Sequence, residues 1–177
     1  MTEANRTTGG TSAAPAEHAF TSSRVFDAPR DLVWKALTES ERLMQWWGPK
    51  GFTVRVAEVD LRPGGTFLYC LQSADGYEMW GKWVYREITP PERLVTISSF
   101  TDAQGSPIRH PVEPHWPLEM LGTMTLAEHE GKTTVTVQAL PHNATDEESK
   151  TFFDGRDGMA EGFTGTFDKL AAYLAKA

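Results

Sequence analysis

The sequence predicts an α+β fold in which an antiparallel sheet of about seven strands is followed by a long C-terminal helix. The β-prone segments are separated by tight turns, which favours one curved antiparallel meander. The C-terminal segment instead repeats apolar side chains every three or four residues, as a helix packed on one face does. With 177 residues, 40% of them hydrophobic, the chain can build the core of one domain.

The domain is expected to span residues 19–177. Residues 1–18 are polar and rich in Thr, Gly and Ser, and they contain no hydrophobic segment typical of a secretory signal. A segment of this composition buries too little apolar surface to fold, so we expect a disordered N-terminal tail there. The first strand is expected over residues 19–26, where β-prone residues partly alternate with polar ones.

Two short helices are expected after the first strand. Pro29 suits the first turn of a helix, where its missing N–H group is no loss. Ser40 is a candidate N-cap for the second helix, which Gly48 and Pro49 would end. The apolar faces are expected to consist of Val33, Trp34 and Leu37 in the first helix and of Leu43, Met44 and Trp47 in the second.

Six further strands are indicated by alternating apolar residues and by turns such as Pro63-Gly64-Gly65. Residues 103–117 are rich in proline, so we expect a loop or an irregular edge there. In the first of these strands Glu58 occupies an apolar position of the alternation, which predicts a carboxylate on the inner face. The expected strands span residues 52–60, 66–72, 77–88, 93–100, 118–127 and 133–140.

The last segment is expected to be helical, with Thr145 or Asp146 as its N-cap. Four glycines in this segment are unusual, since each costs about 1 kcal/mol relative to Ala in a helix. They suit a helix that runs close to a sheet or lines a space, although a poorly formed first half explains Gly155 and Gly158 equally well. The apolar stripe consists of Met159, Phe163, Phe167, Leu170 and Leu174, and the glycines are Gly155, Gly158, Gly162 and Gly165.

Charge and cysteine content limit the partners and the location. A formal net charge of −7, without a basic run, argues against nucleic-acid binding. No apolar stretch approaches the ~20 residues that span a bilayer, so no membrane span is expected. The single cysteine, Cys70, cannot form an internal disulfide, and we interpret it as a small buried apolar side chain. This cysteine usage suits a reducing compartment, which predicts a cytoplasmic location.

Motifs for cofactor and metal chemistry were not found in the sequence. It contains no P-loop, no dinucleotide-binding glycine motif, no nucleophile elbow and no zinc-protease motif. His110 and His115 are the only neighbouring histidines, and nothing near them completes a set of metal ligands. We therefore expect no cofactor and no metal ion.

Four stretches resemble the activator of heat-shock-protein-90 ATPase homologue-like family of the START-like (SRPBCC) superfamily. Their order and spacing match over nearly all of residues 19–175. The resemblance implies the helix-grip fold, in which the sheet wraps around the last helix and leaves a pocket between them, but it implies no shared catalytic motif. The stretches are FDAPRDLVWKALTESERLMQWWGP at 26–49, DLRPGGTF at 60–67, YREITPPERLV at 85–95 and MAEGFTGTFDKLAAYL at 159–174.

The chain also departs from the family pattern at two places. Relatives often have Gly-Trp in the last helix, where this chain has Gly162-Phe163. Its segment 107–117 looks longer and richer in proline than usual. Both changes fall where proteins of this kind contact their ligands, so a relative's ligand cannot be transferred directly.

The aromatic residues predict a binding cavity. They are more numerous than the outer face of such a sheet requires, so most are expected to point toward the last helix. They either fill the core completely or leave a cavity of roughly 300–1,000 Å³ for a small hydrophobic or aromatic molecule. The methionines at 79, 120, 124 and 159 suit an adaptable wall. The candidate ligand-binding residues are Trp46, Trp47, Phe52, Phe67, Tyr69, Trp80, Phe100, Trp116, Met120, Met159 and Phe163.

The sequence is also compatible with two other functions. A cyclase or hydrolase would require at least one of Glu58, Glu78, His115 or Glu119 to face the cavity, where burial would raise a carboxyl pKa. A co-chaperone that stimulates a chaperone ATPase is suggested by the family name, although the eukaryotic activator uses an additional N-terminal domain that we do not expect here. A homodimer is also possible. Polar groups that would orient a ligand are Glu58, Tyr69, Glu78, His115, Glu119 and Asp154.

Overall fold

A computed structural model describes residues 19–177, so the tail expected over residues 1–18 lies outside the described residues. The seven strands form one antiparallel sheet, and α4 is the longest helix in the described part of the chain. The elements in chain order are β1 (Phe20–Phe26), α1 (Arg30–Thr38), α2 (Ser40–Trp46), β2 (Phe52–Val59), β3 (Thr66–Ser73), β4 (Glu78–Thr89), β5 (Arg93–Thr101), β6 (Glu119–His129), β7 (Lys132–His142), α3 (Asp146–Asp154) and α4 (Arg156–Leu174).

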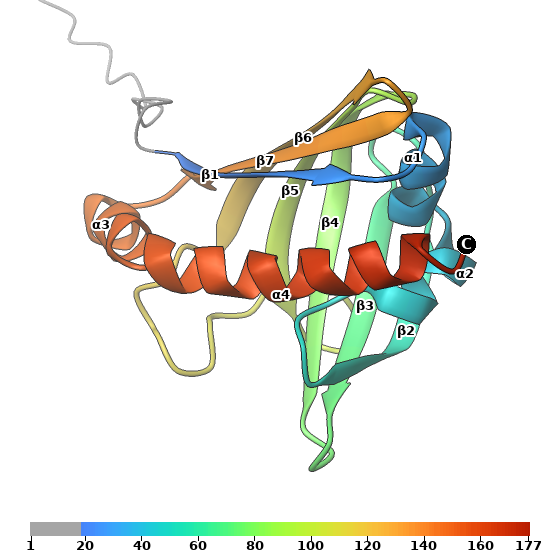
Figure 1. Ribbon diagram of the computed structural model, residues 1–177. Helices are drawn as coiled ribbons and strands as arrows, with labels where there is room; N and C mark the ends of the chain where they lie inside the picture. The colour runs from blue at the N-terminus through green and yellow to red at the C-terminus, as the bar shows by residue number, and fades with distance from the viewer. Residues whose placement is uncertain (1–18) are drawn as a thin grey trace, which may run out of the picture.

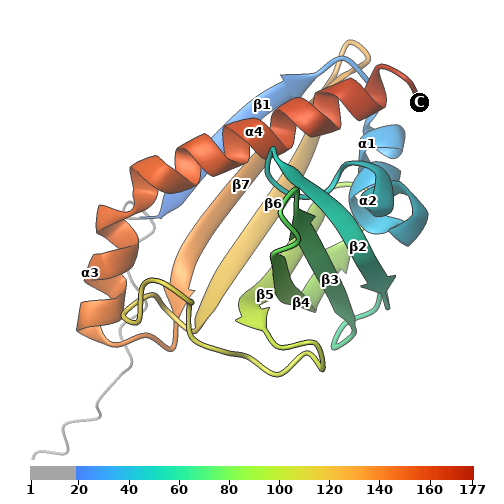
Figure 2. The ribbon, with the colours of Figure 1, turned by 90° about the horizontal axis from the view of Figure 1, so that it is seen from below.

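The sheet curls around α4, which confirms the helix-grip fold. Its strand order is β1-β7-β6-β5-β4-β3-β2, so β2 to β7 form a meander and β1 closes onto β7. Figure 1 shows α4 running along the concave side of the sheet, with α1 and α2 at one end and α3 at the other. The view from below shows the same curvature, with part of the 103–117 loop beside α3 (Figure 2).

Strand register decides which side chains share the concave face. Phe67 pairs with Trp83, and Trp83 pairs with Ser98, which in turn pairs with Met120. Two residues before Ser98 on β5, Thr96 pairs with Gly122 of β6, and Gly122 pairs with Ala139 of β7. Side chains alternate between faces along a strand, so these paired residues share the concave face. On this face aromatic residues lie on β3 and β4, whereas small residues lie along the Thr96–Gly122–Ala139 row of β5 to β7.

The main core lies between the sheet and the helices. Its largest members are almost fully buried, and burying each such side chain stabilises the fold by about 1.5–3 kcal/mol. A second, smaller cluster joins β1 and β7 to α3. The main core includes Trp46, Tyr85, Phe67, Leu37, Leu43, Leu94 and Leu170, and the second cluster consists of Phe20, Ala139 and Phe152.

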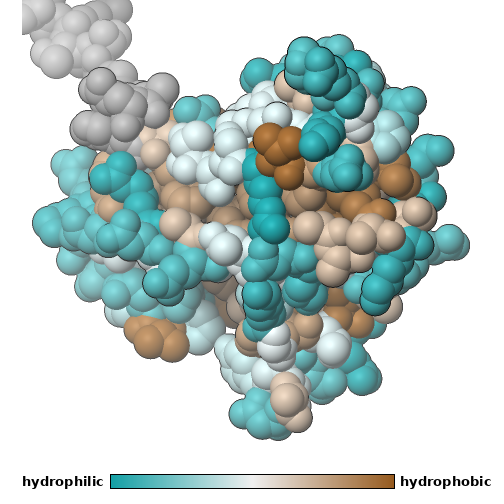
Figure 3. Space-filling model, in the orientation of Figure 1, coloured by the Kyte–Doolittle hydropathy of each residue, from teal (hydrophilic) through white to brown (hydrophobic). Residues whose placement is uncertain are grey.

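The outer surface carries few large apolar side chains. Figure 3 shows a mainly hydrophilic face with separate hydrophobic areas. The most exposed large hydrophobic residue in the described part of the chain is Val112, at 85%. Cys70 is buried, in agreement with its interpretation as a core residue. None of the helices described here is long and apolar enough to cross a membrane.

The second short helix differs from its prediction. Glu39, not Ser40, occupies the N-cap position, and its side chain makes no capping hydrogen bond. The predicted apolar face was correct for Leu43, which is buried, but Met44 is exposed and Trp47 lies beyond the last helical residue. Trp46 takes the buried position instead, and its indole N–H donates to the Ala36 carbonyl oxygen at 2.9 Å.

The C-terminal segment forms two helices rather than one. Gly155 ends α3 and precedes α4, so the break falls at the first of the four glycines. Thr145 caps α3 as predicted. Its hydroxyl accepts from the Glu148 N–H at 3.1 Å, while the Glu148 carboxylate accepts from the Thr145 N–H at 3.2 Å. This reciprocal pair is a capping box.

Replacing Thr145 with Ala is expected to destabilise α3 by about 1 kcal/mol, because the Glu148 N–H loses its acceptor. The measurement is chemical unfolding, with amide hydrogen exchange of residues 146–154 as the local readout. Thr145→Ser keeps the hydroxyl and should retain nearly all of the stability. Equal unfolding curves for the Ala and Ser variants would contradict the role assigned to the cap.

Polar contacts attach α4 to the rest of the fold. The Lys169 ammonium donates to the carbonyl oxygens of Phe52 at 3.0 Å and Trp47 at 3.3 Å, and burial lowers its pKa. Asp168 lies 2.8 Å from Lys50 and 2.5 Å from Arg24, and these two cations lower the pKa of its carboxyl. These contacts hold α4 against both β1 and the segment that leads into β2.

Candidate functional site

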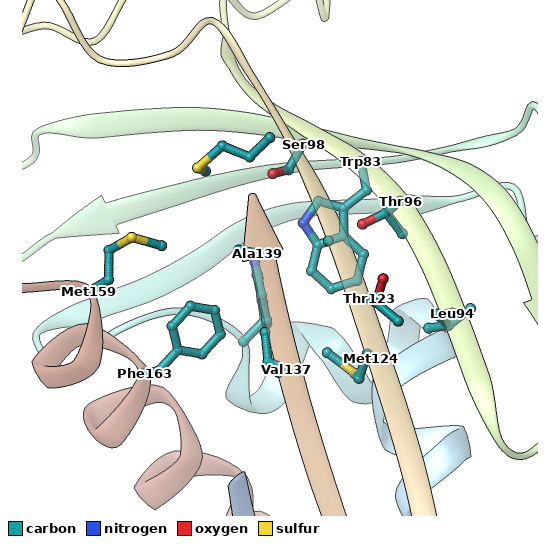
Figure 4. A pocket seen from close by; sticks show the side chains of 13 residues that line it. Trp83, Leu94, Thr96, Ser98, Thr123, Met124, Val137, Ala139, Met159 and Phe163 are labelled. Atoms are coloured by element: carbon teal, nitrogen blue, oxygen red, sulfur yellow. The ribbon is translucent and has the colours of Figure 1, made fainter. Parts of the chain in front are cut away.

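A cavity of about 90 Å³ lies between the concave face of the sheet and α4. Its thirteen lining residues come from β4, β5, β6, β7, α4 and the position directly after α2, and Figure 4 shows their side chains. The lining residues are Trp47, Trp83, Leu94, Thr96, Ser98, Met120, Gly122, Thr123, Met124, Val137, Ala139, Met159 and Phe163.

The cavity exists because small residues occupy the concave face where β5, β6 and β7 run side by side. Thr96, Gly122 and Ala139 form one continuous row across these strands. A side chain at position 122 would have little room, since an added Cβ would lie 3.2 Å from the Thr96 hydroxyl oxygen. Met159 and Phe163 of α4 lie across the space from Trp83 (Figure 4).

A second hollow, of about 360 Å³, lies next to the cavity. The two share Met120 and Met159, so these methionines separate the inner space from the outer one. The hollow is lined by Phe100, His110, Trp116, Met120, Gly155, Gly158 and Met159.

The 103–117 loop forms one wall of the outer hollow. The His110 ring packs 5.0 Å from the Phe100 ring, and the Trp116 ring lies 5.5 Å from Phe152 of α3. Arg109 pairs with Glu148 at 2.7 Å, which ties the loop to α3. The proline-rich segment and the glycines at the start of α4 therefore meet at one place, the outer end of the cavity.

The volume differs from the expectation. The inner cavity is smaller than the roughly 300–1,000 Å³ typical of small-ligand sites, whereas the outer hollow lies within that range. The space between Trp83 and Met159 is nevertheless not packed solid, so the alternative of a completely filled core is wrong.

Six of the eleven predicted ligand-binding residues line the inner cavity or the outer hollow, and a seventh, Tyr69, lines a small side pocket. Trp47, Met120, Met159 and Phe163 line the inner cavity. Phe100 and Trp116 line the outer hollow, and both border a small side pocket with Tyr69. Burial raises the pKa of the Tyr69 phenol to about 12, so this hydroxyl is neutral at physiological pH.

The other four predicted residues are not among those that line the cavity or the hollow. Trp46 and Phe67 are buried in the core, and Phe52 is half-buried on β2. Trp80 lies on the opposite face of β4 from Trp83, because the two are an odd number of positions apart, three, along the strand. Trp83 takes the inward position that Trp80 was expected to hold.

Several lining residues were missed by the sequence reasoning. Strict alternation along β4 could have identified Trp83, since Tyr85 belongs to the same face. No signal marks Thr96, Ser98, Gly122 or Ala139, because small residues occur on any strand. Of the four methionines expected in the wall, Met120, Met124 and Met159 line the cavity, while Met79 is not among the lining residues.

None of the polar residues predicted to orient a ligand lines the cavity or the outer hollow. Glu58 is exposed, so its placement on the inner face was wrong. His115 is exposed beside Glu147, and Asp154 pairs with Lys150 at 2.6 Å. Glu78 is exposed and Glu119 is half-buried, and neither lines the cavity. Within residues 19–177 no three His, Cys, Asp or Glu side chains gather in a way that could hold a metal ion.

Several polar atoms at the cavity have no hydrogen-bond partner among the described residues. The indole Nε1 of Trp47 is completely buried without a partner. The Trp83 indole and the hydroxyls of Thr96 and Ser98 make no side-chain hydrogen bond within residues 19–177, and Trp83 and Thr96 are 9% and 8% exposed. Of these atoms only Trp47 Nε1 is completely buried, a state in which polar groups are rarely left unpaired, so its missing partner requires an explanation. The polar atoms of Trp83, Thr96 and Ser98 belong to residues that line the cavity, and they are not among the completely buried atoms.

A known protein family matches most of this sequence, in agreement with the observed fold. The profile of the family described as "Activator of Hsp90 ATPase homolog 1-like protein" matches residues 27–175. Among curated proteins, none matches the sequence.

Solved structures of similar shape come from several bacteria. A protein of Nitrosomonas europaea is 28% identical, with a TM-score of 0.72 over 92% of this chain and 97% of that one. A protein of Mycobacterium smegmatis is 26% identical, with a TM-score of 0.71 over 87% and 88% of the two chains. One from Arthrobacter aurescens is 24% identical, with a TM-score of 0.72 over 94% and 92%, a likeness of fold alone.

Proposed function

This chain belongs to the family of activator of Hsp90 ATPase homolog 1-like proteins, and from that premise we propose that it binds an uncharged, mainly apolar small molecule between the sheet and α4. The START-like fold of the family is a ligand-binding architecture. The observation that carries the proposal is the cavity itself, which is enclosed by aromatic, aliphatic and methionine side chains.

The character of the lining supports an uncharged ligand. All thirteen lining residues are uncharged types, and the few polar ones carry only hydroxyl or indole N–H groups. A charged ligand in such surroundings would lose its hydration without gaining an ion pair, and this costs several kcal/mol. An apolar ligand instead gains about 25 cal/mol for each Å² of surface that it removes from water.

The methionines support a ligand larger than the inner cavity. Met120 and Met159 stand between the inner cavity and the outer hollow, and their unbranched side chains can change rotamer. Such a rearrangement would join the two spaces. A ligand would then enter between the start of α4 and the 103–117 loop, with its deepest part against Trp83.

Binding is better supported than the two alternative functions. The enzyme hypothesis required Glu58, Glu78, His115 or Glu119 to face the cavity, and none of them lines it. The co-chaperone hypothesis rests on the family name alone.

Replacing Ala139 with Leu tests the proposal. Ala139 lines the cavity at the sheet, so the added carbon atoms are expected to enter the empty space. We expect the variant to be more stable by about 1 kcal/mol, as cavity-filling substitutions commonly are. It should also bind Nile red, an uncharged fluorescent dye, about tenfold more weakly. The measurements are thermal unfolding and the saturable increase in Nile red emission.

Gln138→Leu is the matched control, because residue 138 is the neighbour of Ala139 on the opposite face of β7. This variant adds an apolar side chain without entering the cavity and should bind the dye as the unmodified protein does. The proposal fails if Nile red shows no saturable binding. It also fails if Ala139→Leu binds the dye with unchanged affinity.

A further inference from the structure

The unpartnered polar groups of the cavity are not scattered. Trp83 and Ser98 are directly paired across β4 and β5, so their Cβ atoms are about 4.5–5.5 Å apart on the same face. Figure 4 shows the Trp83 indole nitrogen and the Ser98 hydroxyl on the same side, toward the space in front of Met159 and Phe163. Thr96 lies two residues from Ser98 along β5 and faces the same space.

These groups are mainly hydrogen-bond donors. An indole N–H can only donate, and this holds for both Trp83 and Trp47. A serine hydroxyl can rotate to donate as well. A hydrocarbon that filled the cavity would separate the Trp83 N–H from water without supplying an acceptor, which costs about 1–3 kcal/mol, whereas an occupant that carries an acceptor avoids this cost.

We propose that the ligand carries a carbonyl oxygen on an apolar skeleton, and that this oxygen accepts from the Trp83 indole N–H and the Ser98 hydroxyl. A carbonyl oxygen has two lone pairs and can therefore serve two neighbouring donors at once. An anionic acceptor such as a carboxylate is disfavoured, because the lining offers no cation to pair with it. The inference rests on the proposed function, and it adds the chemical class of the ligand.

The test compares two probes of the same shape, acetophenone and α-methylstyrene, in which a CH₂ group replaces the carbonyl oxygen. Both are titrated into ¹⁵N-labelled protein, and the indole N–H signal of Trp83 is assigned by its loss in Trp83→Phe. Acetophenone is expected to bind about fivefold more tightly, the equivalent of one neutral hydrogen bond. It should also move the Trp83 indole proton downfield, whereas α-methylstyrene should not.

Ser98→Ala removes the second donor and needs no large rearrangement, so it remains informative if Trp83→Phe fails to fold. It is expected to reduce the preference for acetophenone to about twofold. Thr125→Val, which removes a hydroxyl from the opposite face of β6, should leave the preference unchanged.

Apolar binding and the preference for a carbonyl oxygen can be contradicted separately. Equal affinities for both probes, with no downfield shift at Trp83, would overturn the carbonyl proposal and leave apolar binding intact. If neither probe binds, the proposed function fails together with it. A preference that persists undiminished in Ser98→Ala would exclude Ser98 as a donor and overturn the two-donor arrangement.

Discussion

Replacing Phe67 with Ala is expected to lower the free energy of unfolding by about 3–5 kcal/mol. The ring is completely buried, and its centroid lies 5.1 Å from that of Tyr69, 5.2 Å from Trp83 and 5.8 Å from Trp47. Removing it leaves a hole that three rigid aromatic neighbours cannot easily fill. The measurement is denaturant unfolding, with the midpoint shifted and the slope unchanged.

The same substitution should reach the binding site. The rings of Trp47 and Trp83 both pack against Phe67, and both residues line the cavity. Their positions should therefore become less defined when the Phe67 ring is removed. Nile red affinity should fall even at temperatures where the variant is folded. Phe67→Leu should lose less stability, and Val112→Ala, at an 85% exposed position, should change it by less than about 0.5 kcal/mol. A loss below about 1 kcal/mol in Phe67→Ala would contradict the central place of this ring.

Most elements of the fold could be predicted because their signals are local. Alternation marks the strands, and the three-to-four spacing of Phe163, Phe167 and Leu170 marks α4. The errors also have local causes. Glu39 and Ser40 are adjacent, and either can stand at the boundary of a helix whose cap makes no side-chain hydrogen bond. The break between α3 and α4 depends on how tightly the chain turns at Gly155, beside Trp116, and this contact is distant in sequence.

The candidate site was predicted only in part, because it depends on register. Which of Trp80 and Trp83 faces inward depends on how β4 pairs with β3 and β5, and a one-residue change reverses every side chain. The empty space is a property of small residues from three strands that come together only in the folded sheet. The aromatic and methionine content therefore indicated a cavity, whereas Thr96, Ser98 and Gly122 carried no signal of their own.

The turn between β2 and β3 illustrates a motif whose physical reason appears only in the structure. Gly64 has φ of +83°, and its N–H donates to the Tyr85 carbonyl oxygen at 2.7 Å. Gly65 is buried, and its carbonyl oxygen accepts from the Tyr85 N–H at 2.9 Å. The two glycines thus attach the turn to β4 by a pair of backbone hydrogen bonds, just before the register shift of that strand.

Replacing Gly65 with Ala is expected to cost about 3 kcal/mol, because the new methyl group would overlap the carbonyl oxygen of Asp60 and lie 3.0 Å from that of Arg62. Backbone atoms cannot move aside as a flexible side chain can, so the turn must open and release Tyr85. Gly64→Ala should cost only about 1–2 kcal/mol, since its methyl group meets nothing and only the positive φ is strained.

Gly162→Ala provides a control of opposite sign. Position 162 lies within α4 with open space around it, so Ala should stabilise the protein by about 1 kcal/mol. Chemical unfolding of the three variants should therefore rank them Gly162→Ala, Gly64→Ala and Gly65→Ala, from most to least stable. If Gly65→Ala unfolds at the same denaturant concentration as Gly64→Ala, the close approach of Gly65 to the Asp60 carbonyl oxygen does not hold the turn on β4. The glycine at position 65 would then need a different explanation.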